Sequence, residues 1–169
     1  FITLFYASAK LGTILVPINW RLTSVEIIHI IKNVGAKYLF IESDFSKVSK
    51  KLINKIINLI IIGIDFIPSS KNTLKYLKKS ISQTTITKCN SDFDYPMLIV
   101  YTSGTTGKPK GATLSQKAIY YNILNSINMH NFTKLDHILT VIPLFHVGGL
   151  NIQTIPALHI GAKVTLHKK

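Results

Sequence analysis

The feature that most constrains the fold is a short apolar run leading directly into a loop rich in glycine, hydroxyl residues and lysine. The run Pro96–Tyr101 contains β-branched and aromatic residues, which favours a strand. The loop that follows, Tyr101–Gly111, reads YTSGTTGKPKG. A second short strand is expected at Ala112–Leu114, and a helix from the N-cap Ser115 to about Asn128. The sequence therefore predicts a loop at the carboxyl end of a strand.

This loop has the composition of a phosphate-binding loop. Its glycines allow positive φ and the close approach of a ligand, so that backbone N–H groups can turn toward one anion. Hydroxyl groups can donate to phosphate oxygens or offer a lone pair to Mg²⁺, and lysines bring positive charge. A surface loop without a ligand is the alternative. The residues concerned are Ser103, Gly104, Thr105, Thr106, Gly107, Lys108, Lys110 and Gly111.

The loop does not match the Walker pattern of the common NTPases. Gly107 and Lys108 are followed by Pro109, and the position five residues before Gly107 is Thr102 instead of glycine. The string YTSGTTGKPKG instead resembles, nearly residue for residue, the phosphate-binding signature of the adenylate-forming enzymes. This superfamily includes acyl-CoA synthetases, aryl-CoA ligases, luciferases and the adenylation domains of peptide synthetases. A kinase-like or NTPase domain remains an alternative, although the sequence has neither Asp-Phe-Gly nor His-Arg-Asp.

Two further segments are similar to the same superfamily, in the same order along the chain. The first, Ala9–Leu22 (AKLGTILVPINWRL), has a structural interpretation, because Gly12 can end a helix over Phe1–Leu11 and Pro17 disfavours helix at the residue before it. The second, Val141–Leu150 (VIPLFHVGGL), places His146 beside two glycines, before an expected helix over Leu150–His159.

Taken alone, His146 is more often a packing residue than a functional one. The resemblance to acyl- and aryl-CoA ligases implies that it lies against the acyl pocket, near the carboxylate and the adenylate. Small residues beside it would leave room for an acyl chain. The implied pocket residues are Phe145, His146, Gly148 and Gly149.

The resemblance implies ATP-dependent activation of a fatty or aryl acid to an acyl-adenylate, with release of pyrophosphate and transfer to CoA. ATP, Mg²⁺ and CoA would be the cofactors and co-substrates. Lys108, Thr106 and His146 would be catalytic, Thr106 would also bind the metal, and Thr102 would join the phosphate contacts. An o-succinylbenzoate–CoA ligase type of enzyme and a truncated, non-catalytic nucleotide-binding remnant are the alternatives.

One position departs from the pattern of many relatives. They carry histidine after Leu-[Ser/Thr], whereas here Leu114 and Ser115 are followed by Gln116. Glutamine can exchange hydrogen bonds but does not titrate near neutral pH. A role that needs an imidazolium at this position is therefore in doubt.

The resemblance also suggests how the chain is organised. We expect residues 1–169 to form part of one large N-terminal AMP-binding domain. The downstream part of that domain, with its adenine-binding Tyr-Gly-x-Thr-Glu segment, and the small C-terminal domain would lie outside this sequence. The fragment alone is expected to be inactive.

The expected fold class is α/β, with parallel sheets flanked by helices, because apolar runs alternate with helical patterns. A capping-box pattern at Thr23–Glu26 predicts a helix that ends at Gly35, followed by a strand at Tyr38–Ile41. Further elements are expected as a helix over Phe45–Ile56, a strand at Leu59–Ile62 within the apolar stretch Ile56–Ile67, and a short helix near Leu74–Lys79.

Composition limits the remaining functions. The formal net charge is +13, yet the lysines are dispersed, without arginine clusters or aromatic interleaving, so we expect no nucleic-acid partner. Cys89 is the single cysteine, which permits no internal disulfide and fits a reducing compartment. No apolar stretch is long enough to span a bilayer. With the family resemblance, these features predict a cytoplasmic protein, while its oligomeric state is unknown.

Overall fold

The computed structural model describes residues 1–53, 55–68, 72–80, 92–102 and 109–167. The chain divides into two compact units, and each is described by itself. The first unit comprises Phe1–Asn19 and Lys88–Lys169, and the second comprises Trp20–Thr87. The chain thus leaves the first unit, builds the second, and returns. The expectation of one AMP-binding domain over residues 1–169 stays a prediction.

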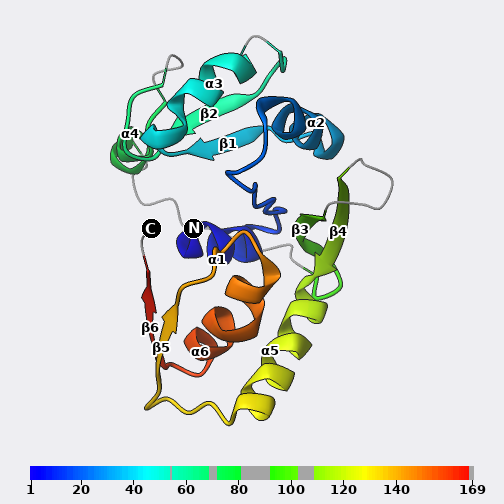
Figure 1. Ribbon diagram of the computed structural model, residues 1–169, viewed down its shortest axis with the longest axis vertical. Helices are drawn as coiled ribbons and strands as arrows, with labels where there is room; N and C mark the ends of the chain where they lie inside the picture. Colours follow the sequence, from blue (N-terminus) through cyan, green and yellow to red (C-terminus); the bar gives the residue numbers. More distant parts are fainter. Residues whose placement is uncertain (54, 69–71, 81–91, 103–108, 168–169) are drawn as a thin grey trace. The chain divides into compact units, whose positions relative to one another are not determined.

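The second unit is a parallel strand pair covered by helices (Figure 1). The capping box predicted at Thr23 is confirmed: its hydroxyl accepts from the Glu26 N–H, and the Glu26 carboxylate accepts from the Thr23 N–H. Gly35, at φ 61°, ends that helix as predicted. The elements are α2 (Ser24–Val34), β1 (Tyr38–Ile41), the 3₁₀ turn η1 (Ser43–Phe45), α3 (Ser46–Ile53), β2 (Ile60–Gly63) and α4 (Leu74–Ser80).

Two expectations for this unit are corrected. The helix expected over Phe45–Ile56 is shorter, since α3 ends at Ile53. A strand was expected at Leu59–Ile62 within the apolar stretch Ile56–Ile67, whereas β2 covers Ile60–Gly63. Asn58 takes a positive φ of 65° before β2, and a Cβ on Gly63 would lie 2.1 Å from the Phe66 carbonyl oxygen, because the chain folds back tightly there. Turns at both ends therefore limit the strand.

The first unit contains an antiparallel pair, β3–β4, and a parallel pair, β5–β6. The parallel arrangement expected from the sequence thus holds for β1–β2 and β5–β6. The segment between β3 and β4 is too short for a parallel crossover, which needs a dozen or more residues. The elements are α1 (Ile2–Leu11), β3 (Pro96–Thr102), β4 (Lys110–Ser115), α5 (Gln116–His130), β5 (His137–Thr140), the π-helix η2 (Gly148–Thr154), α6 (Ile155–His159) and β6 (Lys163–Leu166).

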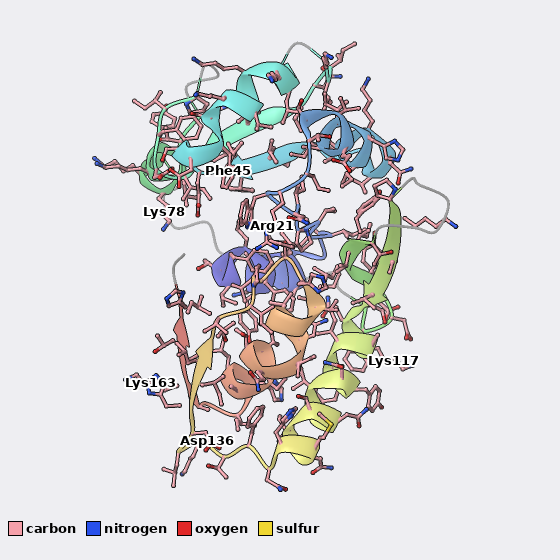
Figure 2. The ribbon with its side chains drawn as sticks, in the orientation of Figure 1. Arg21, Phe45, Lys78, Lys117, Asp136 and Lys163 are labelled. Atoms are coloured by element: carbon pink, nitrogen blue, oxygen red, sulfur yellow. The ribbon has the colours of Figure 1, made fainter. Side chains whose placement is uncertain are left out.

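The core of the first unit lies where α1, β3, α5, η2 and α6 meet. Figure 1 shows η2 and α6 between α5 and the β5–β6 pair. The Lys163 N–H donates to the Asp136 carbonyl at 3.0 Å, which holds the beginnings of β5 and β6 together (Figure 2). On its other edge, β3 is bridged by Leu15, which follows α1. The buried core side chains are Phe5, Met97, Leu98, Val100, Ile119, Ile123, Leu150 and Ile155.

The helix expected over Leu150–His159 is instead a π-helix continued by an α-helix. Pro156 has no N–H, so it cannot donate a hydrogen bond to the carbonyls four and five residues earlier, those of Ile152 and Asn151. Two side chains of α5 donate to those carbonyls: Asn122 Nδ2 to Asn151 O at 2.8 Å, and the Ser126 hydroxyl to Ile152 O. Asn122 and Ser126 lie one helical turn apart on the same face of α5, so the two helices are joined by polar contacts beside the apolar core.

Candidate functional site

The two ends of the predicted phosphate loop lie side by side. Thr102, the last residue of β3, is paired with Lys110, the first residue of β4. Both side chains are exposed, and among the described residues Lys110 forms no ion pair. The hairpin therefore presents a hydroxyl and an ammonium group at the point where the loop begins and ends. Six of the predicted site residues lie outside the described residues: Ser103, Gly104, Thr105, Thr106, Gly107 and Lys108.

Gly111 serves a close approach between strands. Gly111 does not take the positive φ that a glycine allows, because it lies in β4, and the glycines with positive φ in the described part are Gly12, Gly35 and Gly161. Its cross-strand partner is Tyr101, and a Cβ on Gly111 would lie 2.8 Å from Ile99 Cγ2 and 3.1 Å from the Tyr101 ring. Burial raises the pKa of the Tyr101 hydroxyl above its ordinary value. The absence of a side chain at Gly111 lets this ring cover the strand.

The segment around His146 forms a tight turn before the π-helix. The His146 N–H donates to the Pro143 carbonyl at 3.1 Å, and the His146 carbonyl accepts from Gly149 and Leu150. The imidazole is exposed, with its centroid 6.2 Å from the ring of Phe145. An exposed ring beside this turn is accessible to a ligand.

The two glycines after His146 have different surroundings. A Cβ on Gly149 would lie 2.5 Å from Ile142 O and 2.6 Å from Pro143 O, whereas nothing lies within 4 Å of a Cβ on Gly148. The Gly149 carbonyl also accepts from the buried Thr154 hydroxyl at 2.6 Å. Gly149 thus makes room for the protein backbone, and only Gly148 faces open space that a substrate could use.

A cavity of about 350 Å³ opens between β4, the first turns of α5, and the beginning of the π-helix. Of the predicted pocket segment, Val147 lines it, while Phe145, His146, Gly148 and Gly149 are not among its lining residues in the described part of the chain. The cavity lies within the first unit. Its lining residues are Leu114, Ala118, Ile119, Asn122, Val147, Asn151 and Ile152.

Sequence reasoning did not identify this cavity. Leu114 and Asn151 lie far apart in the sequence, and the packing of α5 on the π-helix brings them together. A usable signal was present at Pro156, because a proline near the start of a helix leaves earlier carbonyls without backbone donors. Nothing in the sequence identified Asn122 as the residue that would serve one of them.

Gln116 has a structural contact. Its Nε2 donates to the Ala9 carbonyl at 3.2 Å, which joins the start of α5 to the end of α1. The hydroxyl of Ser115 accepts from the Ala118 N–H, so the predicted N-cap is confirmed. The side chain that replaces the expected histidine is therefore held against the protein.

Within the described ranges, no group of three or more His, Cys, Asp or Glu side chains could hold a metal ion. None of the helices found in the described part of the chain is both long and apolar enough to cross a membrane.

Comparisons with known proteins place the chain in a family. The model of the AMP-binding enzyme family matches residues 1–169. The indoleacetate–CoA ligase of Aromatoleum aromaticum is 40% identical over 164 residues, which cover 97% of this chain and 32% of that protein. The fatty acid–[acyl-carrier-protein] ligase ScoC of Streptomyces coeruleorubidus is 33% identical over 153 residues, covering 87% of this chain and 28% of that protein. The chain spans about a third of the length of these curated relatives.

The fold is shared with solved structures. The anthranilate CoA ligase AuaEII, crystallised in complex with anthranoyl-AMP, matches with a TM-score of 0.88 at 24% identity, and the match covers 99% of this chain and 33% of that one. The expected α/β fold of an adenylate-forming enzyme is confirmed. Since the family model matches every residue of the sequence, this chain belongs to the AMP-binding enzyme family.

Proposed function

We propose that the full-length protein uses ATP to convert a carboxylic acid into an acyl-adenylate and then transfers the acyl group to the thiol of CoA. The observation that carries this proposal is the YTSGTTGKPKG loop, in a chain that matches the AMP-binding family over its whole length. The hairpin supports it, because the pairing of Thr102 with Lys110 brings both ends of the loop to one place.

In the first step, a carboxylate oxygen attacks the α-phosphorus of ATP, the bond to the β-phosphate oxygen breaks, and pyrophosphate leaves. Two anions must meet for this reaction. At 4 Å and an effective dielectric constant near 20, two like unit charges repel by roughly 4 kcal/mol. Fixed positive charge and N–H donors around the β- and γ-phosphates therefore lower the barrier.

Residues of the loop would supply this stabilisation. Lys108 and Lys110 would neutralise the departing pyrophosphate, and the hydroxyls and N–H groups of residues 102–107 would bind phosphate oxygens. The Thr106 hydroxyl would be the ligand that this loop offers to a Mg²⁺ ion, and the ion would supply positive charge beside the phosphates. A hydroxyl oxygen is a suitable ligand because Mg²⁺ is a hard cation that takes oxygen ligands.

In the second step, the thiol attacks the acyl carbonyl and AMP leaves with the bonding electron pair. His146 would lie near the reacting carbonyl, and its exposed ring beside Phe145 is consistent with that role. CoA is the proposed acceptor because the relative with 40% identity is a CoA ligase. An acyl-carrier protein is the competing acceptor, since the relative at 33% identity uses one.

An aromatic acid is the proposed substrate class. The similarity to the indoleacetate–CoA ligase supports it. The cavity beside Val147 also supports it, because its volume of about 350 Å³ lies at the small end of the range that holds compact ligands.

Removing the Lys108 ammonium group tests the role of the loop. In the full-length protein, we expect Lys108→Ala to lower kcat/KM for acid-dependent pyrophosphate release by about 100-fold, the usual cost of losing one transition-state contact. Lys134→Ala, an exposed lysine of the same unit away from the hairpin, is the matched control and should keep wild-type kinetics.

The same assay, run with and without CoA, tests the reaction as a whole. Thioester should form only when acid, ATP and CoA are all present. Release of phosphate from ATP without dependence on any acid, or equal kinetics for Lys108→Ala and Lys134→Ala, would overturn the proposal and leave a nucleotide-binding remnant.

A further inference from the structure

We propose that the acid accepted by this protein carries a neutral N–H or O–H donor on a compact apolar body, and that the side-chain amides of Asn122 and Asn151 recognise this donor in the cavity beside Val147. This inference rests on the proposed function and adds to it the chemical feature by which substrates are discriminated. It follows from the lining of the cavity and from the hydrogen bonding of the two asparagines.

The cavity is apolar except for these two amides. Five of its seven lining residues are aliphatic, and none is charged. A carboxylate or a phosphate would be poorly stabilised by the described lining residues, because none of them is a cation and they form no cluster of N–H donors. The cavity therefore suits the part of an acid remote from its carboxylate, with amide groups that can fix its orientation.

Asn122 offers a hydrogen-bond acceptor in a fixed orientation. Its Nδ2 donates to the Asn151 carbonyl at 2.8 Å, and a carbonyl can only accept, so the nitrogen must be at that end of the amide. The Oδ1 atom consequently points away from that bond. Asn122 is exposed at the cavity, so its oxygen is accessible to a donor.

Asn151 offers a second acceptor, which the protein itself does not satisfy. The residue is 8% exposed, and its Oδ1 has no hydrogen-bond partner among the described residues. A buried polar atom without a partner is rare and costs stability. Because χ2 of asparagine has a broad distribution, rotation of this lining side chain would turn its oxygen toward a donor in the cavity.

A purely structural role is the rival explanation for both residues. Asn122 donates a hydrogen bond to the Asn151 carbonyl, to which Pro156 cannot donate because it has no N–H. This contact alone would account for the presence of Asn122. It does not account for Asn151, whose side-chain oxygen makes no bond in the described structure. The decisive variant is therefore at Asn151, where no known contact is lost.

The test compares two acids that differ only at the donor. Indole-3-acetic acid has a ring N–H, and benzothiophene-3-acetic acid has sulfur in its place with nearly the same shape. In the full-length protein, we expect kcat/KM for pyrophosphate release to favour the N–H acid by about tenfold, the worth of one good hydrogen bond. Asn151→Leu should lower this ratio.

Asn125→Leu is the matched control, since Asn125 is exposed on α5 and does not line the cavity. It should keep the wild-type ratio. Equal kcat/KM for the two acids in the wild type, or an unchanged ratio in Asn151→Leu, would overturn the proposal.

A binding measurement separates this inference from the proposed reaction. 3-Methylindole should raise the melting temperature of the wild type more than 3-methylbenzothiophene does, and this difference should shrink in Asn151→Leu. If the difference appears but no acid supports pyrophosphate release, the recognition site stands and the proposed reaction fails. If acids react but neither assay distinguishes N–H from sulfur, the reaction stands and the recognition site fails.

Discussion

Gly148 and Gly149 are adjacent, yet a methyl group added to each would meet different surroundings. At Gly149 it would lie within 2.6 Å of two backbone carbonyl oxygens, which cannot move as a flexible side chain can. We expect Gly149→Ala to destabilise the protein by about 1–3 kcal/mol, as overpacking does. The free energy of unfolding in urea measures this.

Gly148→Ala is the natural comparison for that substitution. The added Cβ would enter open space, and alanine has a higher helix propensity than glycine. The free energy of unfolding should therefore stay equal or rise by up to about 1 kcal/mol. Equal destabilisation by both substitutions would contradict the different surroundings described for the two glycines.

At the residue scale, the sequence indicated which small residues matter, but not why each of them has to be small. Gly111 and Gly149 were predicted at a ligand site because they are small. Both are small because a protein neighbour comes close: the Tyr101 ring at Gly111 and the carbonyls of residues 142 and 143 at Gly149. These neighbours depend on strand register and on a turn, which a motif does not specify. The roles of the loop residues stay predictions.

At the scale of elements, the capping box of α2 predicts a pH effect. Two hydrogen bonds hold the pKa of the Glu26 carboxyl below its ordinary value of 4.5. The larger effect comes from the side chain of Thr23, and the smaller one from its backbone. The folded-state pKa is thus depressed, so the stabilisation is fully present above the unfolded-state pKa and is lost as pH falls through the folded-state value. The free energy of unfolding in urea should differ between wild type and Glu26→Gln at pH 7. This difference should shrink as the pH is lowered to 3.

Glu42→Gln is the control for that experiment. Glu42 precedes the η1 turn but makes no side-chain cap bond. The pH-dependent difference found for Glu26→Gln should be larger than the one found for Glu42→Gln. If the difference in unfolding free energy between wild type and Glu26→Gln stays constant from pH 7 to pH 3, protonation of Glu26 is not linked to stability.

Elements with local signals were predictable, and those shaped by tertiary contacts were not. Helix α2 has its cap, its terminal glycine and its apolar spacing within one short segment, and strand β1 was predicted with its observed bounds. The π-helix has no such local signal. It depends on Pro156, on two side chains of α5, and on the Thr154 hydroxyl, which donates to the Gly149 carbonyl and accepts from Thr140 at 2.7 Å.

At the scale of the whole molecule, the sequence predicted an α/β chain but not its division. The chain enters and leaves the second unit at residues 20 and 87, while the first unit combines α1 with the segment from residue 88 onward. Contacts between β3 and the segment after α1, such as Leu15 beside Leu98, join parts of the chain that lie far apart along the sequence. Periodicity reports local structure, so it could not reveal this arrangement.

The central claim is that the protein forms an acyl-adenylate, and exchange of labelled pyrophosphate into ATP tests it most directly. The exchange requires only the first step, so it does not depend on the identity of the acceptor. In the full-length protein we predict that label enters ATP only when a carboxylic acid is present, and that Lys108→Ala slows this exchange by about 100-fold while Lys134→Ala does not. A folded protein that binds ATP but shows no acid-dependent exchange across a panel of aromatic and fatty acids would contradict the claim.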